Sequence, residues 1–130
     1  IGINVFRDCT SLTSITIGNG VTSIGISAFR DCRSLTSITI GNGVTSIGGS
    51  AFRDCRSLTG ITIPDGVTSI GYRTFFECAN LSTVTFLGDA PKEGQNIFTR
   101  STPTIYRKPE AKGWGDTFGG KPVKLISEKP

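Results

Sequence analysis

Residues 29–51, FRDCRSLTSITIGNGVTSIGGSA, decide the fold because the chain is built from copies of this stretch. The copy before it, residues 6–28, differs at only two positions. A third copy, residues 52–74, carries six changes, and a fourth begins at Phe75 and decays toward its end. A fixed period of 23 residues is the signature of a repeat architecture.

The apolar residues of one copy are too few to bury a core by themselves. Stacked copies would instead place Leu on Leu, Ile on Ile and Phe on Phe in continuous internal columns. The sequence therefore predicts a repeat solenoid. In the first copy the positions that would form these columns are Leu12, Ile15, Ile17, Val21, Ile24, Ala28 and Phe29, with Cys32 after them.

Each copy divides into three parts. Residues 11–17, SLTSITI, alternate β-branched apolar with polar residues, which predicts a half-buried strand. Gly18, Asn19 and Gly20 follow as turn residues. Residues 21–25 predict a short second strand, and residues 27–32 a tight helical or 3-10 turn that leads into the next copy.

An Asn-Gly pair between two alternating runs is also a strong hairpin signal, so each copy could instead fold on itself. Two observations favour the solenoid. The near-identity of successive copies is expected if each residue pairs with its own equivalent in the next copy. Pro64, which takes the place of Gly41, fits a solenoid corner better than a closed hairpin ladder.

The pattern LxxIxI, a Gly- or Pro-containing turn, VxxIG and AFxxC resembles the BspA-like, or Treponema-type, leucine-rich repeat over residues 1 to about 87. The resemblance implies a right-handed superhelix with a parallel sheet on its concave side. It also implies a cell-surface or secreted protein, since members of the family are typically of that kind and several bind host or matrix proteins. The sequence departs from the usual pattern at Gly18 and Gly41, where the family often has Pro, and Pro64 restores that residue.

Two regions are expected. Residues 1–87 would form the repeats, with the first copy truncated because the chain begins inside one. Residues 88–130 would form a degenerate repeat, with the period broken at residues 92–99, and a C-terminal cap that covers the last apolar layer. The apolar residues suited to the cap are Ile105, Trp114, Phe118, Val123 and Leu125.

Composition argues against several functions. Histidine is absent, which removes the commonest general base and metal ligand, and no nucleophile–base pair or phosphate-binding loop is recognisable. We therefore expect neither an enzyme nor a cofactor. The net charge of +4 comes without a dense basic stripe, which argues against a nucleic-acid partner, and no apolar run is long enough to span a membrane.

Two periodic rows resemble functional sites. Cys9, Cys32, Cys55 and Cys78 recur with the repeat, a spacing unlike that of zinc ligands, and parallel side chains in a ladder do not favour disulfides, so we expect buried free thiols. The second row is acidic and consists of Asp8, Asp31, Asp54 and Glu77. A row of carboxylates resembles a glycosidase or calcium site, but the neighbouring arginines predict exposed ion pairs instead.

The outward row of the predicted sheet is the remaining candidate surface. It is small and polar, which suits weak or multivalent binding to a protein ligand. Such a protein-binding or adhesion module is the first functional hypothesis, and a structural spacer without a ligand is the alternative. We also expect the uncovered N-terminal edge, residues 1–17, either to self-associate or to fray. The row consists of Ser14, Thr16, Ser37, Thr39, Thr62, Thr83 and Thr85, with Gly60 among them.

Overall fold

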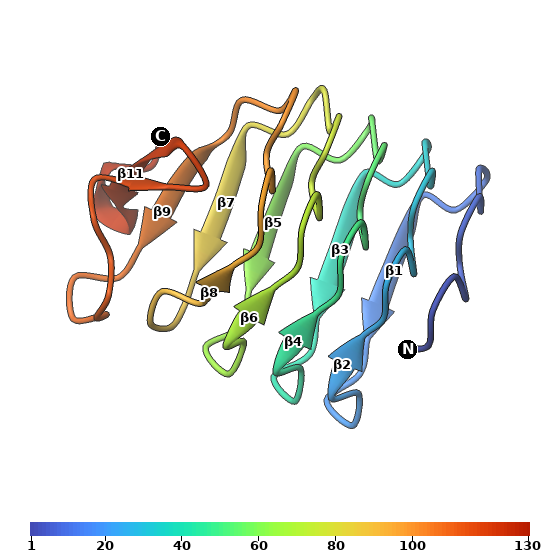
Figure 1. Ribbon diagram of the computed structural model, residues 1–130, viewed down its shortest axis with the longest axis horizontal. Helices are drawn as coiled ribbons and strands as arrows, with labels where there is room; N and C mark the ends of the chain where they lie inside the picture. The colour runs from blue at the N-terminus through green and yellow to red at the C-terminus, as the bar shows by residue number, and fades with distance from the viewer.

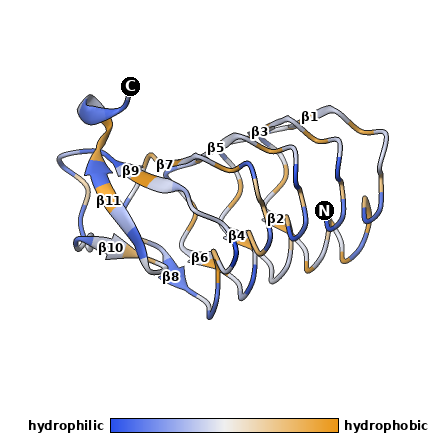
Figure 2. Cartoon of the chain, turned by 90° about the horizontal axis from the view of Figure 1, so that it is seen from above, coloured by the Kyte–Doolittle hydropathy of each residue, from blue (hydrophilic) through white to orange (hydrophobic).

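The computed structural model describes all residues from Ile1 to Pro130 as a β-solenoid (Figure 1). Five strands form the long-strand side, and four two-residue strands form the short-strand side opposite it (Figure 2). The long strands are β1 (Ser14–Ile17), β3 (Ser37–Ile40), β5 (Gly60–Ile63), β7 (Thr83–Phe86) and β9 (Thr104–Arg107). The short strands are β2 (Ser23–Ile24), β4 (Ser46–Ile47), β6 (Ser69–Ile70) and β8 (Lys92–Glu93).

The paired strands within each side are parallel, and in the repeats each paired residue lies opposite its equivalent in the next copy. Ile15 lies opposite Ile38, and Ser46 lies opposite Ser69. This register confirms the solenoid and excludes the hairpin, in which Ile15 would pair with Val21 or Ile24. The near-identity of the copies thus has a direct structural meaning, because identical residues meet.

The core is a set of columns along the solenoid axis, and the most regular is made of phenylalanines. Phe29, Phe52 and Phe75 are fully buried and stack with ring centroids 5.5–5.6 Å apart and interplanar angles of 4–7°. Phe6 and Phe98 extend the column at its two ends. Stacked aromatic side chains bury a large apolar area and also interact favourably through their offset rings.

The expected break of the period at residues 92–99 is wrong. Lys92 pairs with Ser69, Phe98 stacks on Phe75 at 5.6 Å, and both relations keep the 23-residue spacing. The spacing shortens only afterwards, where Thr104 pairs with Thr83. Backbone hydrogen bonds hold the register here, and Gly94 and Phe98 keep their places in the repeat although the side chains between them change. The division into regions at residue 87 stays a prediction, and β7 pairs with β9 across it.

The segments that lead from the short strands back to the long strands are tight turns, which we call the turn column. Arg30 donates a backbone hydrogen bond to Ser27 and Cys32 donates one to Phe29, three residues back in each case. Ser27 and Asp31 adopt positive φ angles of 56° and 63°, so these turns do not join into a continuous helix. The one helical segment, η1, is the 3-10 turn Ile126–Glu128, and no helix is long enough to cross a membrane.

The C-terminal segment packs on the last coil at the long-strand side, and its role as a cap stays a prediction. Strand β11 (Lys121–Leu125) pairs in parallel with β9 and antiparallel with β10 (Thr117–Phe118). The rings of Trp114 and Phe118 pack on Phe86 with centroids 4.9 and 5.2 Å away. The indole N–H of Trp114 donates to the carbonyl of Gly88 at 3.2 Å, so this residue is part of that packing and not a free stacking platform.

Candidate protein-binding face

The structure brings the predicted Ser/Thr row together on the long-strand side, but exposes only part of it. Thr83 is half-buried and Thr85 is buried, so the accessible row is shorter than the sequence predicts. The exposed members are Ser14, Thr16, Ser37, Thr39 and Thr62 on β1, β3 and β5. We call these five residues the exposed hydroxyl row.

The C-terminal tail covers the other end of this row. The ammonium group of Lys129 donates to the hydroxyl of Thr85 at 3.1 Å and lies 5.9 Å from the centre of the Tyr106 ring. Lys129 lies 44 residues from Thr85 in the sequence and outside the repeats, so no periodic signal could have predicted this contact. The tail therefore limits the accessible face to the first three long strands.

A hollow of about 210 Å³ interrupts the same face between β3 and β5. The two strands lie side by side without a regular hydrogen-bonded ladder, whereas β1 pairs with β3 and β5 with β7 along all four residues. We call this break the seam. The hollow is lined by Ile38, Thr39, Ile40, Asn42, Thr62, Pro64 and Leu87.

Pro64 explains the seam. In the preceding copy a Cβ on Gly41 would lie 2.6 Å from the carbonyl oxygen of Gly18. The approach that glycine permits between the first two copies is thus too close for the proline ring in the third.

The neighbouring turn also loses an inter-copy bond at the seam. The N–H of Asn42 donates to Oδ1 of Asn19 at 3.0 Å, and Lys112 donates to Asp89 in the same way at 2.8 Å. No such bond joins Asp65 to Asn42. The sequence marked this position through Pro64, but only the structure places the resulting hollow beside the exposed hydroxyl row.

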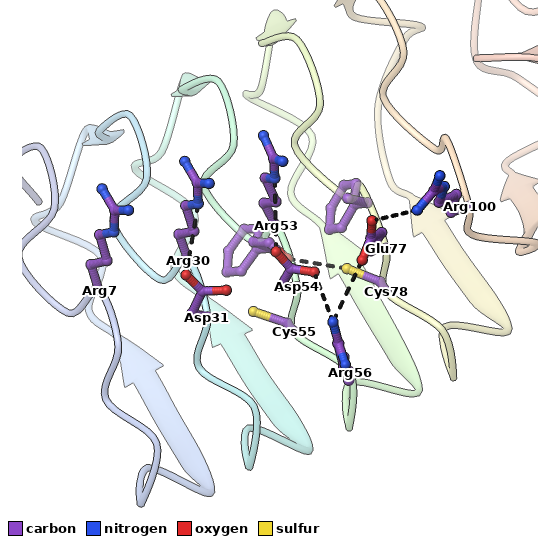
Figure 3. A network of polar contacts seen from close by, with 12 residues as sticks. Arg7, Arg30, Asp31, Arg53, Asp54, Cys55, Arg56, Glu77, Cys78 and Arg100 are labelled. Atoms are coloured by element: carbon purple, nitrogen blue, oxygen red, sulfur yellow. Dashed lines mark hydrogen bonds and ion pairs between the residues drawn. The ribbon is translucent and has the colours of Figure 1, made fainter.

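The row of acidic and basic residues lies on the turn column (Figure 3). From the third copy onward it links successive coils: Arg56 contacts Asp54 at 3.6 Å and Glu77 at 3.5 Å, and Arg100 contacts Glu77 at 3.0 Å. The arginines that make these links are exposed, so the row acts as a solvated ion-pair network. No group of three or more potential metal ligands is arranged around a common point.

The cysteines are free thiols, as predicted, and three of the four are buried. Each buried thiol donates to a phenylalanine carbonyl of the preceding coil, for example Cys55 to Phe29 at 3.2 Å. Burial raises the pKa of Cys32 to about 11 and that of Cys78 to about 12, and it raises the pKa of Cys55 further. These thiols stay protonated at neutral pH, so they are neither nucleophiles nor metal ligands there.

Two solved structures resemble this chain. The T. pallidum leucine-rich repeat protein matches over 82% of this chain with 29% identity and a TM-score of 0.73, and the match covers 50% of that protein. A leucine-rich repeat protein from Bacteroides ovatus matches over 95% of this chain with 26% identity and a TM-score of 0.71. The chain spans 32% of the length of that second protein.

A search of curated protein sequences finds no match. A family description does match, namely the BspA-type leucine-rich repeat region, with six copies over residues 1–106. This range is most of the chain and includes every coil of the Phe column. The chain therefore belongs to the family of BspA-type leucine-rich repeat proteins.

Proposed function

We propose that this chain is a non-catalytic protein-binding module that contacts its partner through the exposed hydroxyl row. The observation that carries the proposal is the hollow at the seam, which lies within this row between Thr39 and Thr62. It breaks the uniformity of an otherwise flat face. A partner side chain could enter it while small hydroxyl groups on both sides bind the partner's backbone.

The chemistry of the face sets the kind of contact. The residues that line the hollow include Ile38, Ile40 and Pro64, all of them buried, so the hollow suits an aliphatic side chain. The exposed row has none of the Trp, Tyr or Arg anchors that dominate strong interfaces. Single contacts of this kind are weak, and repeated copies would increase the overall affinity through multivalency.

The test is to block the hollow. The variants Thr39→Arg and Thr62→Arg place a long charged side chain at its two walls, and Thr45→Arg is the matched control at an exposed threonine next to the short strands. The probes are purified extracellular-matrix proteins, immobilised as a panel and measured by interferometry. We expect wild type and Thr45→Arg to bind the same panel member and both blocking variants to lose it. Equal binding by all four proteins would contradict the proposal.

A structural spacer is the second candidate, and the near-identity of the first two copies favours it. A specific site usually needs different side chains on successive copies, whereas a spacer does not. The same panel separates the two candidates. A spacer predicts that no matrix protein binds to the wild-type chain, and that the blocking variants behave like wild type throughout.

The family relation also supports a location outside the cell, at the surface or secreted, which is part of this proposal. Protease added to intact cells reaches only proteins outside the membrane. We therefore expect it to degrade the chain without lysis of the cells. The proposal is wrong if the chain is degraded only after the cells are lysed.

Self-association through the N-terminal edge completes the proposal. Strand β1 pairs only with β3, and Ile3 and Val5 are 64% and 56% exposed in the same end coil, where residues 1–6 lie along residues 23–28. An unpaired strand edge with exposed apolar side chains favours edge-to-edge association. Sedimentation should show a concentration-dependent dimer that Val5→Lys weakens. A monomer at every concentration would contradict this part.

A further inference from the structure

Each coil of the turn column donates three parallel backbone hydrogen bonds to the coil that follows. In the second coil, Ser27, Phe29 and Asp31 donate to the carbonyls of Gly49, Ala51 and Arg53 at 2.8–2.9 Å. The same three bonds join the first coil to the second, the third to the fourth and the fourth to the fifth. The turn column is therefore held together along its whole length by backbone pairing.

The fifth coil has the same three donors and no acceptor for them. The N–H groups of Asn96, Phe98 and Arg100 make no hydrogen bond within the chain, although Phe98 is only 1% exposed. Buried backbone N–H groups without a partner are rare and costly. Only Phe98 is such a buried residue, since Asn96 and Arg100 are exposed, but all three are donors that pair in every earlier coil, so the chain's own pairing pattern is incomplete here.

The neighbouring short strand, β8, has carbonyl acceptors that lack donors. The carbonyls of Thr68 and Ile70 accept hydrogen bonds from Lys92 and Gly94 of the next coil, at 2.8 Å each. The equivalent carbonyls one coil later belong to Pro91 and Glu93, and no following coil donates to them. Along the chain, the open rim of the fifth coil thus presents two free carbonyl acceptors and then three free N–H donors. A further coil would pair with them in this order.

The path of the C-terminal segment explains this rim. Strand β11 covers β9 on the long-strand side, and the chain reaches it from Trp114 through the β10–β11 hairpin without making another turn over the turn column. A hollow of about 510 Å³ remains between the rim and the hairpin. Its lining residues include Gly94, Gln95, Asn96, Phe98, Thr99 and Gly119.

We infer that this rim binds an extended polypeptide segment of a partner protein, which takes the place of the missing coil. The alternation of carbonyl acceptors and N–H donors favours a peptide backbone, since a small anion would use only the donors. Addition of a segment to an open backbone edge is a known mode of peptide recognition. This surface is separate from the exposed hydroxyl row, and the inference does not depend on that face.

The structure also restricts the segment's sequence. Gly25, Gly48, Gly71 and Gly94 form a column in which a Cβ on each would lie 2.4–2.7 Å from the backbone of the coil before it. A residue stacked on Gly94 would meet the same constraint. The partner segment must therefore place glycine at this position.

The experiment titrates the isotope-labelled full chain with the capped heptapeptide TSIGGSA, the sequence of residues 45–51, and follows backbone amide signals by NMR. We expect saturable shifts at Asn96, Phe98 and Arg100. The control peptide TSIVGSA, with valine for the stacked glycine, should produce none. Thr99→Trp, inside the hollow, should abolish the shifts, and Thr102→Trp, an exposed threonine outside it, should leave them unchanged.

Four outcomes would overturn the inference. They are shifts confined to other residues, equal binding of the valine peptide, the same shifts on addition of inorganic phosphate alone, and the same shifts on concentrating the chain without peptide. The third outcome would identify an anion site and the fourth a second copy of the chain. Circular dichroism of both tryptophan variants verifies that they fold, so loss of binding reports on the site.

Discussion

The contact between the first two copies and the contact between the second and third differ more than their sequences do. In the first, β1 and β3 pair along four residues, and the following turns are joined by the amide of Asn19. In the second, β3 and β5 form no ladder and a hollow opens between them. The core residues at the two contacts are nearly the same. One proline at the corner of the coil therefore decides whether adjacent strands pair.

The seam is confined to one side of the solenoid. Across the same contact, the short strands stay paired, with Thr68 donating to Thr45 at 2.9 Å and Gly71 to Ile47 at 2.8 Å. The turn column also keeps its three bonds, such as Phe29 to Ala51 at 2.8 Å. Copies two and three are thus attached at two of their three sides. Disturbing one side of a coil leaves the other two in register, which is how a repeat protein tolerates a local irregularity.

The largest effect should come from a core residue at the second contact. Phe52 is fully buried and stacks between Phe29 and Phe75. Replacing it with alanine should lower the free energy of unfolding by about 3–5 kcal/mol, because the cavity cannot collapse between two fixed coils. Denaturant unfolding measures the loss. Phe76→Ala, at a half-buried neighbour, is the control and should cost much less.

A second seam can be made at the first contact with Gly41→Pro. The ring would lie against the carbonyl of Gly18, so β1 and β3 should separate, at a cost of about 1–3 kcal/mol. Hydrogen exchange should show faster exchange of the β3 amides. The reverse change, Pro64→Gly, should slow the exchange of the β5 amides. If Gly41→Pro left β1 and β3 paired, proline would not be the cause of the natural seam.

Alkaline pH should weaken both contacts through the buried thiols. Their pKa values rise from the ordinary 9.0 to about 11 for Cys32 and about 12 for Cys78, because burial disfavours the thiolate. The unfolded chain therefore loses these protons first. Stability should be constant below pH 9 and fall as the pH rises toward the folded-state values.

Unfolding measured across this range tests the thiol effect, with Cys55→Ser as the control. Serine should be tolerated there, since Ser101 occupies the equivalent place one coil beyond Cys78 and donates to the carbonyl of Phe75. The variant should reduce the alkaline loss of stability. If Cys55→Ser and wild type lose the same stability at alkaline pH, other titrating groups cause that loss.

The smallest effect should come from the ion pairs of the turn column, which join the third coil to the fourth but not the second to the third. Arg56 links Asp54 to Glu77, whereas its equivalent Arg33 makes no ion pair. Arg56→Ala should cost about 0.2–1 kcal/mol at low salt and less at high salt. Arg33→Ala should have no measurable effect. Equal losses for the two variants would mean that the network adds nothing to stability.

The sequence predicted most of the fold because identical residues meet in a solenoid. The strands, the register and the Phe column all follow from the near-identity of the copies. The continued register at Lys92 and Phe98 was missed because most side chains of residues 91–99 differ from the earlier copies, although Gly94 and Phe98 keep the 23-residue spacing from Gly71 and Phe75.

The candidate face was predicted less well than the fold. The strand pattern placed the Ser/Thr row correctly, but burial of Thr85 depends on Lys129, a contact between distant parts of the chain. The seam depends on how far one proline ring holds two coils apart, and that distance is not encoded in hydrophobic periodicity. Sequence patterns report which way a side chain points, and not what lies over it.

The pairing of each residue with its own equivalent also has an evolutionary consequence. Because the surfaces joining copies one and two are the same on both sides, a duplicated or deleted copy creates no new interface. Unequal recombination between the corresponding gene segments would change the length of the array by one 23-residue coil at a time. The distance between the seam and either end is therefore free to vary by whole coils while the seam itself stays intact.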